Sequence, residues 1–133
     1  MDFALATVRF VMVHVTLARF EELVADALDS IPPELADELD NVAVVVEDWP
    51  TPEQLDGRNG TLLGLYEGVP LTERGPISYA GVMPDHITVF RGPLCALAHD
   101  EADLAEQVRV TVLHEIGHYF GMDDAHLHEL GWA

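Results

Sequence analysis

Apolar residues recur at helical spacing near the start of the chain. Residues 17–29 carry apolar side chains every three or four positions, and Thr16 can cap the first turn. Pro32 and Pro33 end this helix and can open a short second one. The pattern therefore predicts a helix over residues 17–29 with one apolar face, made of Phe20, Leu23, Val24, Ala27 and Leu28.

Between residues 41 and 92 the pattern changes to that of strands. "NVAVVVEDWP" is a β-branched run that ends at a proline, "TLLGLYEGVPL" is a second run, and "HITVFRG" alternates from His86 to Arg91. The turn residues of "PEQLDGRNG" predict a loop after the first of these strands. Helix, three strands and helix give an α+β domain in which a small sheet packs on helices.

The last long helix carries the candidate chemistry. Asp100 is its expected N-cap, acidic residues fill the first turns, and an i, i+4 stripe should face the core. On a neighbouring face lie His114 and His118, four residues and only ~40° apart around the axis. Both imidazoles can reach one ion at ~2.0–2.1 Å, and Glu115 can reach a water on that ion. The expected core stripe is Leu104, Val108, Val112, Ile116 and Phe120.

The residues after His118 predict a chain reversal that completes a metal site. Gly121 suits the left-handed position that ends a helix. A compact turn would then bring Asp124 back as a third protein ligand and leave a fourth position open for water, as in catalytic zinc sites. Asp123 is the alternative ligand if the turn is tighter.

These residues resemble a known family. "HEIGHYFGMDD" is similar to H-E-x-x-H-x-x-G-x-x-D, the zincin signature with aspartate as third ligand. "FEELVADALDSIPPEL", "TLLGLYEGVPLT", "MPDHITVFRGPL" and "VTVLHEIGHYFG" extend the resemblance to small bacterial zincin-like, or minimal, metallopeptidases. The resemblance implies one α+β domain over residues 17–133, with a short mixed sheet packed against the active-site helix and the N-terminal helix. It implies one Zn²⁺ per chain, with His114, His118 and Asp124 as ligands and Glu115 as general base.

The resemblance also predicts where a substrate binds, and the chain departs from the metzincin pattern at one point. Zincins commonly bind substrates by strand addition, so the strand from His86 to Arg91 is expected to be the sheet edge that pairs with a peptide. Only nine residues follow Asp124, so no methionine turn like that of the metzincins can lie downstream of it.

Residues 1–16 are expected to form an N-terminal extension or an extra strand, because they lack a clean leader pattern.

Composition narrows the function classes. The 24 acidic and 6 basic residues give a net charge of −18, which argues against nucleic acid and anionic membranes as partners. The single cysteine, Cys95, leaves any metal to His, Asp or Glu and favours a reducing cytoplasm. The expected function is a zinc metallopeptidase acting on peptides or proteins. A metal-dependent RNA hydrolase and a catalytically idle zinc-binding interaction module are the alternatives.

Other residues that could join such a site are expected to have structural roles. His126 and His128 should lie exposed on a short C-terminal helix, and Tyr119 should pack in the interior. Gly117 should allow close packing beneath the site, and Trp49 and Trp132 should be core or edge anchors. No ligand spacing links the remaining histidines, which are His14, His86 and His99.

Overall fold

The computed structural model describes residues 13–39, 41–69 and 85–132, which form six helices and three strands. This confirms the α+β class. In chain order the elements are α2 (Leu17–Asp29), α3 (Pro33–Ala36), β1 (Val42–Glu47), α4 (Pro52–Leu55), β2 (Gly64–Glu67), β3 (Asp85–Phe90), α5 (Arg91–Leu97), α6 (Glu101–Tyr119) and α7 (Asp124–Leu130).

The three strands form a mixed sheet in the order β1-β3-β2. β1 pairs with β3 in parallel, and β2 pairs with β3 antiparallel. The expectation that the strand beginning near His86 is a sheet edge is therefore wrong, because β3 is the central strand. Five of its six residues are buried, as suits a strand with a neighbour on both sides. Among the described residues the edges of the sheet are β1 and β2.

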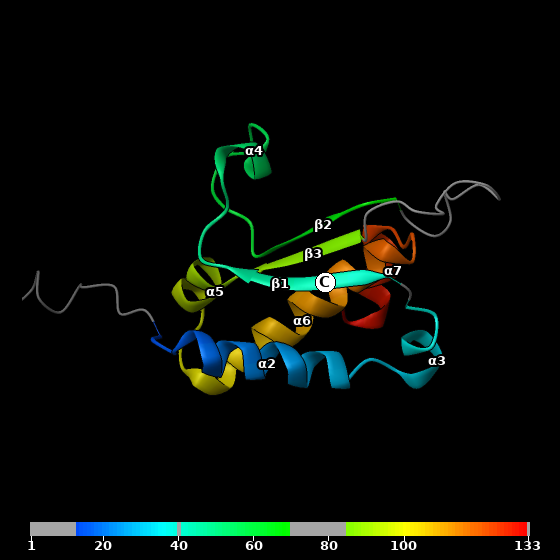
Figure 1. Cartoon of the computed structure of the whole chain (residues 1–133), viewed down its shortest axis with the longest axis horizontal. Coiled ribbons are helices and arrows are strands. Elements are labelled where there is room, and N and C mark those ends of the chain that lie inside the picture. Colours follow the sequence, from blue (N-terminus) through cyan, green and yellow to red (C-terminus); the bar gives the residue numbers. More distant parts are fainter. Residues whose placement is uncertain (1–12, 40, 70–84, 133) are drawn as a thin grey trace, which may run out of the picture.

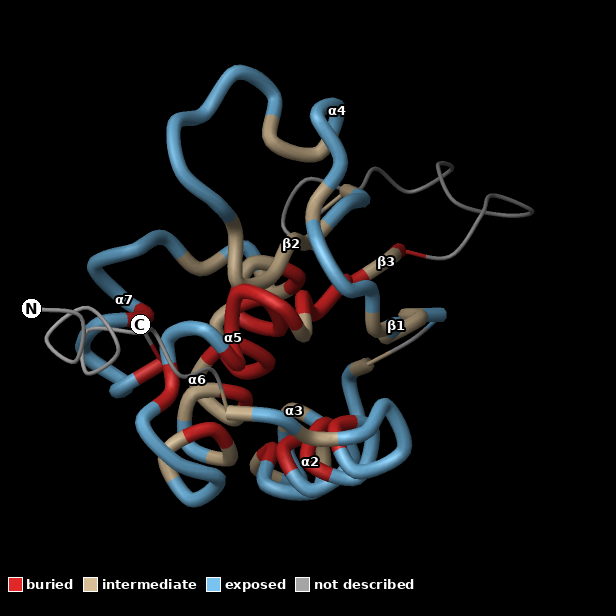
Figure 2. Tube along the Cα trace, turned by 90° about the vertical axis from the view of Figure 1, so that its left-hand side faces the viewer, coloured by how far each residue is buried: buried red, intermediate tan, exposed pale blue. Residues whose placement is uncertain are grey.

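Helix α6 is the centre of the fold and lies between the sheet and α2 (Figure 1). Its predicted stripe forms the core, since Leu104, Val108, Val112 and Ile116 are fully buried, while Phe120 at the helix end is only half-buried. Buried segments are concentrated in β3, α5, α6 and one side of α2 (Figure 2). The apolar periodicity thus places α6 with one face toward α2 and another toward β2 and β3.

The helix starts follow the predicted caps. The Thr16 hydroxyl accepts a hydrogen bond from the Arg19 N–H at 3.0 Å, and the Asp100 carboxylate accepts one from the Asp103 N–H at 2.7 Å. Two short helices were not predicted. Within the expected loop, α4 begins with a reciprocal capping box between Thr51 and the Gln54 side chain. The other, α5, begins directly after β3 ends at Phe90.

The predictions for the chain before α2 and for the two tryptophans agree with the structure only in part. Of the expected N-terminal extension, residues 1–12 lie outside the described residues, and residues 13–16 form neither helix nor strand. Trp132 is buried, as expected of an anchor, whereas Trp49 is 54% exposed and is not a core residue. None of the described helices has the length and apolar character needed to cross a bilayer.

Candidate metal centre

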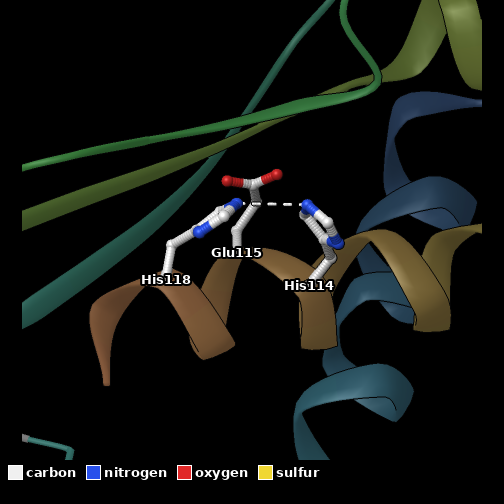
Figure 3. Close-up of side chains that lie close together, drawn as sticks. All are labelled: His114, Glu115 and His118. Atoms are coloured by element: carbon white, nitrogen blue, oxygen red, sulfur yellow. Dashed lines mark hydrogen bonds between the residues drawn. The ribbon is translucent and has the colours of Figure 1, made fainter. Parts of the chain in front are cut away.

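One turn of α6 presents the three residues of the H-E-x-x-H pattern together. Ligand atoms of His114, Glu115 and His118 all lie within 4.8 Å of one another. In Figure 3 one nitrogen of each imidazole points toward the other ring, and the Glu115 carboxylate lies between them on the side of the strands. Helical spacing brings the group together, because His118 lies four residues after His114 and three after Glu115.

The two imidazoles converge through the same atom of each ring. The Nε2 atoms of His114 and His118 are 3.1 Å apart, and the rings are nearly perpendicular, at 88°. Two bonds of ~2.0–2.1 Å at a tetrahedral angle would hold such nitrogens ~3.3 Å apart. The spacing therefore fits two ligands on one zinc ion.

A backbone carbonyl fixes the protonation of His114. Its Nδ1 lies 3.0 Å from the Trp132 carbonyl oxygen, which can only accept a hydrogen bond. The Nδ1 nitrogen must therefore carry the proton, and in the neutral ring Nε2 has a free lone pair directed toward His118. Metal-binding histidines are commonly oriented by such a partner on the other ring nitrogen.

Glu115 is a buried carboxyl group beneath the strands. Burial raises the pKa of Glu115 to about 6; the electrostatic interaction with His114 and a backbone hydrogen bond from Tyr66 in β2 oppose this rise, while the charge of Asp124 adds to it. Gly64 lets β2 come this close, because a Cβ on it would lie 2.7 Å from the Thr111 methyl and 3.2 Å from the Glu115 Cγ. Sequence reasoning did not identify the contribution of β2.

The end of α6 holds the second histidine. Gly121 adopts φ +79°, as expected; its N–H donates to the His118 carbonyl at 2.9 Å and the Met122 N–H donates to the Gly117 carbonyl at 3.0 Å. This pair of bonds is a Schellman motif. Burial lowers the pKa of His118, and a backbone hydrogen bond with Met122 raises it in opposition. The turn thus both ends the helix and supports its last histidine.

Asp124 lies near this group but outside the compact cluster. It is the first residue of α7 and is exposed, and its charge raises the pKa of both Glu115 and His118. Asp123 is the N-cap of α7, and its carboxylate accepts the His126 N–H at 2.9 Å. One oxygen of the Asp123 carboxylate is therefore engaged in capping α7.

A pocket of about 330 Å³ adjoins the cluster between β2 and α6. It ends at His114 and Glu115, and its volume is at the lower limit for a small-molecule site, which suits a single side chain. The remaining lining residues are mainly apolar or uncharged, namely Leu63, Gly64, Gln107, Val110 and Thr111.

His126, His128, Tyr119 and Gly117 lie where the sequence predicts. His126 and His128 are exposed on α7, and Tyr119 is fully buried with its ring edge-on to Tyr66. A Cβ on Gly117 would lie 2.0 Å from the Leu127 side chain, so Gly117 does allow α7 to pack closely.

Sequence reasoning missed the Trp132 carbonyl. A signal was present, because the pair Gly131–Trp132 repeats at the end of α7 the pattern of Gly121–Met122 at the end of α6.

Comparisons with known proteins agree with this geometry. The model of a family described as zincin-like metallopeptidase matches residues 39–132. A solved structure, that of a conserved hypothetical protein from Thermus thermophilus, is similar at 29% identity with a TM-score of 0.53. The similarity covers 87% of this chain and 97% of that one. No curated protein matches the chain.

Proposed function

The chain belongs to the zincin-like metallopeptidase family, and on that premise we propose that it is a zinc-dependent peptidase. The observation that carries the proposal is the convergence of the His114 and His118 Nε2 atoms at 3.1 Å beside the buried Glu115 carboxyl. Two imidazoles would hold the ion, and Asp124 would supply the third protein ligand. A site with three protein ligands leaves a position open for chemistry.

Glu115 would serve as the general base. Zinc bound here would lower the pKa of a coordinated water toward ~7 and polarise a peptide carbonyl. Glu115 would accept a proton from the attacking water at its carboxylate and pass it to the leaving amine. The pKa of about 6 that burial gives this carboxyl group in the metal-free protein lies close to a working pH, as a group that must both accept and donate a proton requires.

The substrate would lie along the edge of β2. This strand is a sheet edge within the described residues, and its Tyr66 lies next to Glu115. An extended peptide can add to such an edge through main-chain hydrogen bonds. The pocket lined by Leu63 and Val110 would then receive one uncharged side chain next to the cleaved bond.

The direct test combines zinc content with peptide hydrolysis. Wild type, Glu115→Gln and Asp124→Ala would be incubated with a mixed peptide library and added zinc, with Glu129→Gln as a matched control on the exposed side of α7. The proposal predicts one zinc per chain and cleavage by wild type and Glu129→Gln. Glu115→Gln should keep its zinc and lose ~10²–10⁴-fold in rate. Bound zinc without cleavage of any peptide would instead indicate an idle zinc-binding module.

A further inference from the structure

Two helices end in the same motif beside the metal centre, and each supports one histidine. At the end of α7, Gly131 adopts φ +77°; its N–H donates to the His128 carbonyl at 3.1 Å and the Trp132 N–H donates to the Leu127 carbonyl at 2.9 Å. This repeats the Schellman motif at the end of α6. In both cases the residue after the glycine hydrogen-bonds through its backbone to an imidazole: Met122 to His118, and Trp132 to His114.

The position of the Trp132 carbonyl is set by packing. Leu127 is fully buried and occupies the space above Gly117, which leaves no room for a Cβ. Trp132 is only 8% exposed, so the chain after the turn is also anchored. Leu127 and Trp132 therefore hold α7 and its turn against the same stretch of α6 that carries the histidines.

We propose that the α7 turn at Gly131 and Trp132 is a positioning device that keeps His114 in the Nδ1–H form and its Nε2 aimed at the metal position. The inference rests on the proposed metal site, and it assigns to Gly131 and Trp132 a role beyond closing the fold. His114 has no other side-chain hydrogen bond among the described residues except the contact with His118. Without the Trp132 carbonyl, the imidazole could exchange its proton between the two nitrogens and rotate.

Gly131 allows a specific test, because a Cβ there meets nothing within 4 Å. Substitution at Gly131 therefore strains the left-handed turn without a collision. Gly57 is a matched control: its φ is +78°, a Cβ there also meets nothing within 4 Å, and it lies in the turn after α4. Gly131→Asn is the conservative variant, since asparagine tolerates the left-handed conformation.

The experiment compares wild type, Gly131→Val, Gly131→Asn and Gly57→Val by two measurements. Long-range ¹H–¹⁵N spectra of the metal-free proteins report which nitrogen of His114 carries the proton, and competition with a chelator gives the zinc affinity. Gly131→Val should lose the uniform Nδ1–H form and bind zinc ~10–100-fold more weakly, as loss of a ligand's hydrogen-bond partner does. Gly131→Asn and Gly57→Val should match wild type in both measurements.

The proposal is overturned if Gly131→Val keeps the Nδ1–H form of His114, or if its zinc affinity equals that of Gly57→Val. Gly131→Ala repeats the comparison with milder strain if the valine variant does not fold. Failure of the peptidase assignment would look different: wild type would show the Nδ1–H form and bind zinc, yet cleave no peptide.

Discussion

The two faces of α6 carry out different tasks under different constraints. The face toward the core holds Leu104, Val108, Val112 and Ile116, all fully buried, and needs only apolar side chains that fill space. The face toward β2 holds His114, Glu115 and His118, which need particular atoms at particular positions. Those positions depend on partners from β2, the α6 turn and the α7 turn. The core face thus needs only apolar residues at helical spacing, whereas the site needs specific backbone groups from several elements.

The largest effect should come from removing a histidine of the site face. His118→Ala deletes one of two convergent imidazoles. Zinc binding in small protein sites amounts to ~10–16 kcal/mol, roughly 3–4 kcal/mol for each ligand, so zinc affinity should fall by ~10²–10³-fold. Chelator competition would measure the loss, and denaturation of the metal-free variant should show little change. Unchanged affinity would exclude His118 as a ligand.

A substitution on the core face of α6 should lower the stability of the fold and leave zinc affinity unchanged. Leu104→Ala removes a fully buried side chain in the first turn of the helix, ten residues before His114 and therefore ~15 Å along the axis. The free energy of unfolding should decrease by ~2–5 kcal/mol. Urea denaturation gives this value, and the zinc affinity of the folded variant should equal that of wild type. Weaker zinc binding in that variant would show that the two faces are coupled.

The burial of Glu115 should make the free energy of unfolding of the metal-free protein depend on pH. Burial raises its pKa from 4.5 to about 6. The stabilising contribution of the protonated carboxyl is therefore fully present below pH 4.5 and is lost as the pH rises through 6. At pH 7 the ionised group costs the metal-free fold ~2 kcal/mol.

Glutamine cannot ionise, so metal-free Glu115→Gln should be more stable than wild type by ~2 kcal/mol at pH 7. The gain should disappear toward pH 4.5, where the wild-type carboxyl group is protonated. Urea denaturation across this range measures both values. A difference that does not change with pH would contradict the assignment of the cost to the charge of Glu115.

The smallest effect belongs to the solvent side of α6. Arg109 and Glu106 form an exposed ion pair three residues apart, and Arg109 lowers the pKa of the Glu106 carboxyl through a hydrogen bond. Because exposed pairs contribute little, Arg109→Ala should change the free energy of unfolding by less than ~1 kcal/mol and leave zinc binding unaltered. Denaturation measures the free energy of unfolding and chelator competition measures the zinc affinity. A larger loss of stability would assign this side of the helix to the core, and a loss of zinc affinity would assign it to the site.

The sequence could predict features that depend on residues close along the chain, but not the contacts that complete the site from other elements. Periodicity and caps were sufficient for α2, α6 and the grouping of His114 with His118, because these depend on residues close along the chain. The order of the strands could not be predicted, and the expectation that β3 is an edge is wrong, because alternation shows which face is buried but not how many neighbours a strand has. The Trp132 carbonyl lies 18 residues from His114, and the Tyr66 backbone reaches Glu115 from another element. Contacts of this kind depend on tertiary packing.

The most direct test of an open zinc site on α6 is the zinc K-edge absorption fine structure of the loaded protein, compared between wild type and Asp124→Ala. An open catalytic site predicts scattering from two imidazoles and two oxygen ligands at ~2.0–2.2 Å in wild type, with altered oxygen scattering in Asp124→Ala. Four protein ligands, or a spectrum without imidazole scattering from two rings, would contradict an open site held by His114 and His118. The first result would indicate a closed structural site, and the second would place the metal away from His114 and His118.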